Sequence, residues 1–249
     1  MAVEFFIAAN DSDKDETLQE FGYRRVGKGF TDVFLGAMVA GIYATTPDKI
    51  SVQAAFPMVV ALEKEYGGLF RGMIAKRKKG GGPGGVLTSF RGGVGSFISH
   101  LKKTIDAEWR LGSPVTGISR DLVGFQVKSE KGSEEFDQVI ISAPAYAAAE
   151  MLAGLDPEMT GRLQKIDYSP IAVVGFGYEE LDHPLNGFGL LTTSAAGLPI
   201  LGALWDSSIF PDRAPDGSKL IRIMIGGQRN PELVGLDDKQ LLKLARDGL

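Results

Sequence analysis

Cysteine is absent from the sequence, and histidine occurs only as His100 and His183. The lack of thiols excludes disulfides, thiolate metal sites and cysteine nucleophiles. The two histidines do not have the spacing of a metal-ligand pair, so we expect no metal site. Long hydrophobic runs are also missing: the longest, residues 33–44, has about 12 residues, whereas a membrane-spanning helix needs about 20. We therefore expect no transmembrane helix.

The chain also lacks a large excess of charge of one sign. The chain carries 27 basic and 31 acidic residues, mixed along its length, for a net charge of −4. Because no extended basic field would attract nucleic acid, we expect no nucleic-acid partner. The opening residues Met1–Ala9 lack the basic leader of a secretory signal. Apolar residues, in contrast, are abundant: they make up 44% of the 249 residues, enough to bury a substantial core.

The first 79 residues have the pattern of a helical unit. Thr17 and Glu20 form the signature of a capping box, which predicts a helix over 18–26. A second helix is expected over 31–40, ending at Gly41, because glycine tolerates the left-handed conformation that closes helices. A third is expected after Asp48, where apolar residues recur at helical spacing.

A glycine-rich stretch separates this unit from the rest of the chain. Residues 80–85 place five glycines around Pro83, a composition that favours a linker. Beyond it we expect a helix over 93–104, followed by short β-like runs. The expected strands cover 108–110, 115–120, 125–129, 138–142, 171–178, 189–193, 201–205 and 219–225, with helices over 145–153 and from Asp237 onwards.

Three glycine motifs deserve a chemical interpretation. Gly22–Gly29 nearly matches a phosphate loop, but Gly29 stands where a Ser or Thr would bind the metal, which favours a turn between helices. Gly92–Gly95 lacks the third glycine of a dinucleotide fingerprint, which favours a helix-opening loop. Gly187–Leu191 surrounds Phe188 with two flexible backbone points; this is typical of a core aromatic at a turn or of one wall of a flat apolar pocket.

Several longer stretches form a recognisable series. They include DETLQEFGYRRVG at 15–27, VAGIYATTPDKISVQAAFP at 39–57, SFRGGVGSFISHL at 89–101, HPLNGFGLL at 183–191 and MIGGQRNPEL at 224–233. Taken in order, these stretches resemble the protoporphyrinogen oxidase family and its coproporphyrinogen-oxidising bacterial relatives. The resemblance implies an α+β fold in three parts. These are a helical insert of membrane-associated type over 1–79, a partial FAD-binding α/β domain over 86–150, and a substrate domain with a mixed β-sheet over 151–249.

The resemblance also implies an activity and a site. The activity is oxidation of a porphyrinogen to the porphyrin in heme biosynthesis, with hydride passing to FAD and oxygen as the final acceptor. By motif match, the residues that would enclose the macrocycle in a flat apolar slot are Gly41, Tyr43, Ala44, Phe188, Leu191 and Met224. The residues that would contact FAD are Val115, Ala143 and Pro144.

Several points stay open at this level. The resemblance does not decide between protoporphyrinogen and coproporphyrinogen as substrate. The family's opening pyrophosphate loop and closing flavin segment have no counterpart here, so we expect FAD to be absent or weakly bound and the isolated chain to be colourless and inactive. We expect a cytoplasmic location or peripheral contact with the inner face of a bacterial membrane. The alternatives are an amine oxidase or carotenoid desaturase segment and a non-enzymatic tetrapyrrole-binding module.

Overall fold

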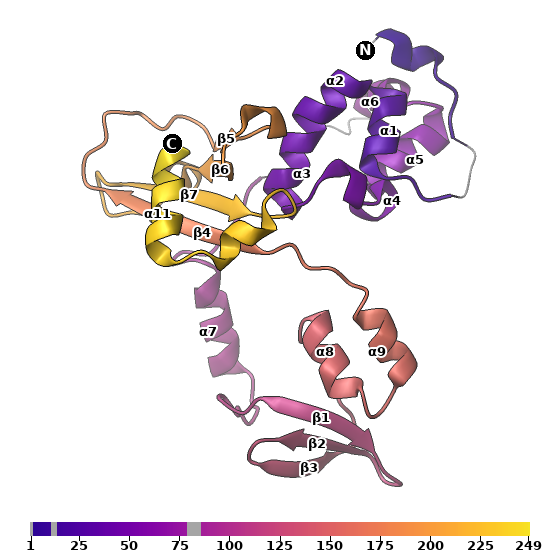
Figure 1. Cartoon of the computed structure of the whole chain (residues 1–249), viewed down its shortest axis with the longest axis vertical. Helices are drawn as coiled ribbons and strands as arrows, with labels where there is room; N and C mark the ends of the chain where they lie inside the picture. Colours follow the sequence, from indigo (N-terminus) through magenta and orange to yellow (C-terminus); the bar gives the residue numbers. More distant parts are fainter. Residues whose placement is uncertain (1, 11–13, 79–85) are drawn as a thin grey trace. The chain divides into compact units, whose positions relative to one another are not determined.

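The computed structural model describes residues 2–10, 14–78 and 86–249, which form two compact units (Figure 1). The larger unit consists of Met1–His100 and Ser169–Leu249, and the smaller of Leu101–Tyr168. The helical segment and the C-terminal sheet therefore belong to one compact unit. The division between the two units falls near residues 100 and 169, whereas the boundaries expected from the sequence lie near residues 80 and 150. The expected linker over 80–85 lies outside the described residues.

Short helices form the first part of the larger unit. They are α1 (Leu18–Arg25), α2 (Lys28–Phe30), a π-helical turn (Thr31–Leu35), α3 (Gly36–Tyr43), α4 (Val52–Ala55), α5 (Pro57–Tyr66) and α6 (Leu69–Lys78), with 3₁₀ turns at Ala2–Phe6 and Pro47–Lys49. The expected capping box is present, with Thr17 and Glu20 each accepting the other's backbone N–H. Within the described ranges, no helix has the length and apolar composition needed to cross a membrane.

Two helix boundaries differ from the prediction. α3 continues through Gly41 and closes at Ala44, which adopts a left-handed φ of 51°. The helix expected after Asp48 is interrupted at Phe56, because Pro57 lacks the N–H that a continuing helix needs and instead begins α5. The phosphate-loop interpretation of Gly22–Gly29 is excluded, since Gly22 lies inside α1, and the favoured inter-helix turn is confirmed.

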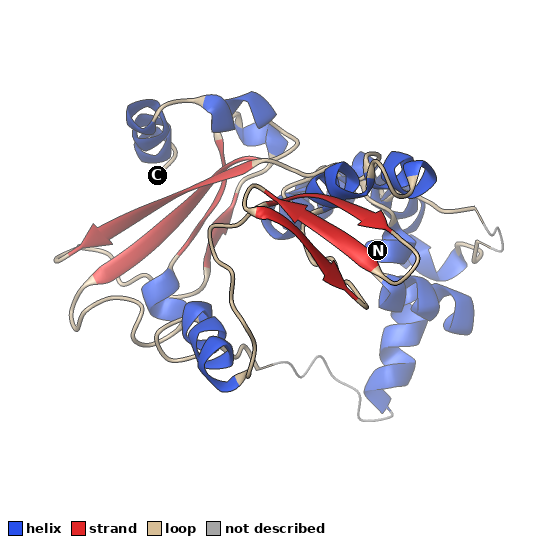
Figure 2. Ribbon diagram, turned by 90° about the horizontal axis from the view of Figure 1, so that it is seen from below, coloured by secondary structure: helices blue, strands red, loops and turns tan. Residues whose placement is uncertain are grey.

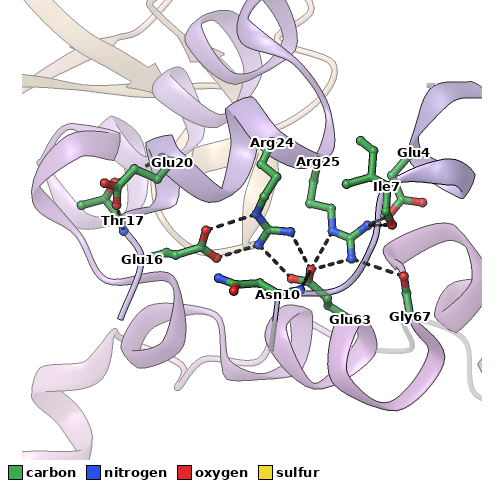
Figure 3. A network of polar contacts seen from close by, with 10 residues as sticks. All are labelled: Glu4, Ile7, Asn10, Glu16, Thr17, Glu20, Arg24, Arg25, Glu63 and Gly67. Atoms are coloured by element: carbon green, nitrogen blue, oxygen red, sulfur yellow. Dashed lines mark hydrogen bonds and ion pairs between the residues drawn. The ribbon is translucent and has the colours of Figure 1, made fainter. Parts of the chain in front are cut away.

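A buried ionic cluster holds the helical part together (Figure 3). The Arg25 guanidinium is completely buried and donates to Glu63 from both Nε and Nη2, at 3.0 and 2.5 Å, and from Nη1 to Glu4 at 3.3 Å. Arg24 bridges Glu16 and Glu63, at 2.6 Å to each. These contacts connect α1 to α5 and to the first 3₁₀ turn, which are far apart in sequence.

The charges in this cluster stabilise one another's ionised forms. Burial opposes ionisation of Glu63, but hydrogen bonds from Arg24, the Asn10 backbone and Arg25 outweigh it and hold the pKa of Glu63 below its ordinary value. Burial likewise opposes the charged form of Arg24, and the contacts with Glu63 and Glu16 raise its pKa nonetheless. The ion pairs therefore favour the charged forms of Glu63 and Arg24 despite the partial burial of both groups.

The second part of the larger unit is a four-stranded antiparallel sheet in the order β4 (Ile171–Tyr178), β7 (Lys219–Gly226), β6 (Ile200–Leu204) and β5 (Gly189–Leu191) (Figure 2). The α+β class is confirmed, but the sheet is antiparallel throughout its described strands and not mixed. Smaller elements are the 3₁₀ turns Ser194–Ala196 and Pro231–Gly235 and the short helix α10 (Asp206–Ile209).

The sheet has one core face and one open face. The amphipathic helix α11 (Asp238–Asp247) packs on β4 and β7. The core under it includes Ile200, Ala203, Ile221, Ile223, Ile225 and Ala245. Along β4, residues toward this core alternate with exposed ones, as expected for a strand with one solvated face. The exposed residues of β4 are Ile171, Val173, Gly175 and Gly177.

The end of β5 is held by a buried threonine. Thr192 Oγ1 accepts from Arg229 Nη1 at 3.1 Å and donates to the Ile200 carbonyl. Among the described residues, Arg229 Nε is buried without a hydrogen-bond partner, and desolvation lowers the pKa of Arg229. Thr192 is therefore an important hydrogen-bond partner for a poorly compensated cation.

We expect Thr192→Val to lower the free energy of unfolding by about 1–3 kcal/mol, because it removes both hydrogen bonds of the buried hydroxyl and leaves polar groups unsatisfied. Urea unfolding measures the change. The matched control is Thr116→Val, at an exposed strand position with one 3.4 Å bond, which should shift stability by less than about 0.5 kcal/mol. Equal effects of the two substitutions would contradict the expectation.

The smaller unit contains a three-stranded sheet and two helices. Its elements are β1 (Val115–Arg120), β2 (Phe125–Ser129), β3 (Gly132–Phe136), α8 (Ala145–Leu152) and α9 (Pro157–Leu163). The last residues of α7 (Val94–Thr104) also belong to this unit, which begins at Leu101. The strands expected over 108–110 and 138–142 are wrong, since neither segment joins a ladder in the described part. β3 escaped prediction because its Gly-Ser-Glu-Glu sequence is polar and fully exposed.

Candidate functional site

One face of the four-stranded sheet carries two of the residues expected to bind substrate, Leu191 and Met224. Strand pairing aligns Val173, Met224, Gly202 and Leu191 in one row across β4, β7, β6 and β5. The next row contains Gly175, Arg222, Leu204 and Gly189. Directly paired residues project to the same side of a sheet, so these two rows form a continuous surface, which we call the open face.

The open face is mainly apolar. Val173 and Leu191 are 54% and 42% exposed, whereas Met224 is nearly buried between them. Gly202 is required under Leu191, because a Cβ there would approach the Leu190 carbonyl oxygen to 2.5 Å and Leu191 Cδ2 to 2.9 Å. On β4, Gly177 adds no side chain and has open space around it. A half-exposed apolar surface with glycines in its rows suits a flat apolar ligand.

Helix α3 borders this face. A Cβ on Gly41 would lie only 2.4 Å from Leu191 Cδ2, so glycine lets the helix backbone approach Leu191 directly. Ala40 clusters with Leu201 and Met224, and Ala44 packs against that cluster. The Ala44 carbonyl accepts from Gln228 N at 2.8 Å, which ties the end of α3 to the turn after β7. Packing thus brings together residues 41, 44, 191 and 224, which are separated by up to 183 positions in sequence.

Tyr43 and Phe188, which were also expected to bind substrate, lie outside the two rows of the open face. Tyr43 is exposed; its ring meets Phe56 edge-on and its hydroxyl donates to the Ala55 carbonyl at 3.4 Å. Phe188 is 61% exposed just before β5, and its carbonyl accepts from Trp205 N at 3.0 Å. The contacts described above do not include either ring. The open face also contains Val173, Gly202 and Arg222, which were not singled out from the sequence. The alternation along 171–178 was the available signal for Val173, whereas the other two needed the strand register.

The residues expected to contact FAD lie in the smaller unit. Val115 opens β1, and a bulge follows it, because Val115 pairs with Ser129 and Gly117 with Lys128. Pro144 precedes the first turn of α8, and the N–H of Ala145 donates to Tyr168 Oη at 2.8 Å. β1 is an edge strand of its sheet. Gly92–Gly95 opens α7 from an irregular segment and not from a strand, which confirms the helix-opening interpretation.

Residues 6–249 match the sequence profile of the flavin containing amine oxidoreductases. The chain belongs to this flavoprotein family. A mitochondrial protoporphyrinogen oxidase of Nicotiana tabacum is 30% identical, over 96% of this chain and 54% of that protein. The coproporphyrinogen III oxidase of Bacillus subtilis is 27% identical, over 100% of this chain and 54% of that protein. The chain thus spans about half the length of these flavoprotein relatives.

A solved structure agrees with the flavoprotein fold. The crystal structure of a candidate protoporphyrinogen oxidase from Exiguobacterium sp. 255-15 aligns with a TM-score of 0.83, at 24% identity, over 98% of this chain and 53% of that one. This similarity supports the arrangement of helices and sheets described above.

Members of the flavoprotein family carry a flavin, and the residues of the smaller unit fit part of one. In the described part of the chain β1 is the outer strand of its sheet, with Val115 at its first position, and Ala143–Pro144 offers a turn with small side chains. Neither position brings a charged side chain. These residues therefore fit uncharged contacts to the nucleotide part of FAD and not the neutralisation of its pyrophosphate.

Proposed function

We propose that the open face binds one side of a porphyrinogen macrocycle, and that this chain is part of a FAD-dependent enzyme oxidising protoporphyrinogen or coproporphyrinogen to the porphyrin. The observation that carries the proposal is the convergence of Leu191, Met224 and Gly41 on one half-exposed apolar surface. The names of the relatives support the substrate class.

In this proposal the chain positions substrate and leaves the redox chemistry to the cofactor. Bound FAD supplies hydride acceptance. Leu191 and Val173 contribute apolar contacts to the macrocycle, and burying them removes water from its face. Gly41 and Gly202 set how closely the backbone approaches the ring, because side chains at either position would displace Leu191. Orientation and exclusion of water are the protein's contributions.

The finer parts of the proposal rest on the family resemblance. The chain would divide into a helical segment over 1–79, a flavin-binding segment over 86–150 and a substrate segment over 151–249. Oxygen would be the final electron acceptor. Peripheral membrane contact through the helical segment is supported by its exposed apolar side chains, which include Phe6, Phe34, Ile42 and Met58.

Binding of the stable product tests the proposal without requiring turnover. The 249-residue chain is titrated with coproporphyrin III, and quenching of tryptophan fluorescence gives the affinity. Leu191→Ser should weaken binding about five- to tenfold. The ligand would bury the exposed part of the leucine side chain, and the serine variant loses that apolar contribution of roughly 1 kcal/mol to the binding free energy. The matched control is Leu190→Ser, since Leu190 is equally exposed, at 43%, but pairs with Ala203 on the opposite face.

Equal weakening by both serine variants would contradict a site on the open face, and so would porphyrin binding that neither variant changes. Failure of the wild-type chain to bind the porphyrin would contradict the proposed function as a whole. Urea unfolding of each variant confirms that the comparison is made between folded proteins.

A further inference from the structure

One cation lies within the apolar open face. Arg222 belongs to β7, two residues from Met224, and its register partners are Gly175 on β4 and Leu204 on β6. Residues two apart on a strand share a face and lie about 7 Å apart. Arg222 is 44% exposed. The two rows that define the open face contain no other charged side chain.

The guanidinium is oriented but not saturated by its described partner. Nη2 donates to Asp206 Oδ1 at 2.7 Å, and Asp206, at the start of α10, is only 16% exposed. This bond uses one of the five N–H donors of an arginine. Asp206 therefore holds the side chain in place while other donors remain available at the exposed edge of the group.

The surface beside Arg222 leaves room for a ligand. A Cβ at Gly175 would meet only Leu220 Cδ1, at 4.0 Å, and one at Gly177 would meet nothing within 4 Å. Both glycines lie on β4, along the flank of β7 that carries Arg222. A group that reaches over the open face from the Leu191–Met224 row can thus approach the guanidinium without displacing side chains of β4.

We propose that Arg222 recognises a carboxylate of the tetrapyrrole that lies on the open face; this rests on the proposed function above. Porphyrinogens of this class combine an apolar macrocycle with peripheral propionates, and so do their flat porphyrin products; this matches an apolar row with a guanidinium one row away. The planar guanidinium suits bidentate pairing with a carboxylate. The apolar surroundings strengthen that pairing relative to bulk water.

The test compares two probes with the same macrocycle, coproporphyrin III and its tetramethyl ester, in which methyl esters replace the four charged carboxylates. Arg222→Gln should weaken coproporphyrin binding about tenfold or more while leaving ester binding within about twofold. Added salt should weaken coproporphyrin binding by wild type more than by the variant. Arg222→Lys keeps the charge but loses the planar guanidinium, so its affinity for coproporphyrin should lie between those of the wild type and Arg222→Gln.

The matched control is Arg162→Gln, because Arg162 also pairs with one carboxylate, that of Glu158, but on the exposed surface of the smaller unit. It should bind both probes as wild type does. If Arg222→Gln binds coproporphyrin as tightly as the wild type does, while Leu191→Ser binds it more weakly, the role proposed for Arg222 is contradicted and the proposed function stands. Equal weakening for acid and ester would also overturn it, as a packing effect. A wild-type chain that binds neither probe contradicts both proposals.

Discussion

Replacing Glu63 by glutamine is expected to lower the free energy of unfolding by about 3–5 kcal/mol, the usual cost of removing one partner of a buried ion pair. Arg25 is completely buried and relies on Glu63 for its two shortest side-chain contacts. Glutamine is nearly the same size, but its amide cannot neutralise two guanidinium groups. The positive charge of Arg25 would remain buried, with Glu4 as its remaining carboxylate partner among the described residues.

Urea unfolding followed by Trp205 fluorescence measures this change, in a Trp109→Phe background, because Trp109 lies in the smaller unit and Trp205 in the larger. The control is Glu158→Gln, which removes a partner from an exposed i,i+4 pair and should cost less than about 0.5 kcal/mol. A loss below about 1 kcal/mol for Glu63→Gln would show that the cluster does not hold the helices together.

The effect of Glu63→Gln has a definite pH dependence. The folded-state pKa of Glu63 is depressed, so its contribution is present above the unfolded pKa of about 4.3 and is lost as the pH falls through the folded value. The difference between wild type and variant should therefore be full at pH 7 and shrink below about pH 4. A difference that grows toward acid pH would contradict this sign.

The second large effect is expected at Gly189, where alanine should cost about 3 kcal/mol or more. Its φ is +133°, a conformation that residues with a side chain rarely adopt. An added Cβ would lie 1.9 Å from the Ala203 carbonyl oxygen, which is backbone of the neighbouring strand and cannot rotate away. The edge strand β5 would have to separate from β6, and Leu191 would move with it.

Gly189→Ala should therefore also weaken coproporphyrin binding. The control for stability is Gly177→Ala, which should leave the free energy of unfolding nearly unchanged, because the φ of Gly177 is not positive and a Cβ there would meet nothing within 4 Å. Urea unfolding of both variants and porphyrin titration of Gly189→Ala provide the measurements. Wild-type stability of Gly189→Ala would mean that β5 pairs with β6 differently from the arrangement described here.

Local patterns predicted most elements of the fold. The capping box at Thr17 places α1, the apolar period places α7 and α11, and alternation places β1, β2, β4 and β7. Such signals succeed because hydrogen bonds and propensities act between near neighbours in sequence. Local signals failed for residues 138–142, which are apolar enough for a strand but join no ladder in the described part. A strand needs a partner that its own sequence cannot supply.

The sequence by itself determined the absence of thiol chemistry, and its resemblance to a known family indicated the α+β class and four of the residues proposed to meet a tetrapyrrole, Gly41, Ala44, Leu191 and Met224. Tertiary structure decided which of them share a surface. Gly41 meets Leu191, Met224 aligns with Gly202, and Arg222 joins their face. The physical reason is register: a shift of one residue would turn every side chain of a strand to the opposite face, and register depends on contacts between segments far apart in the chain.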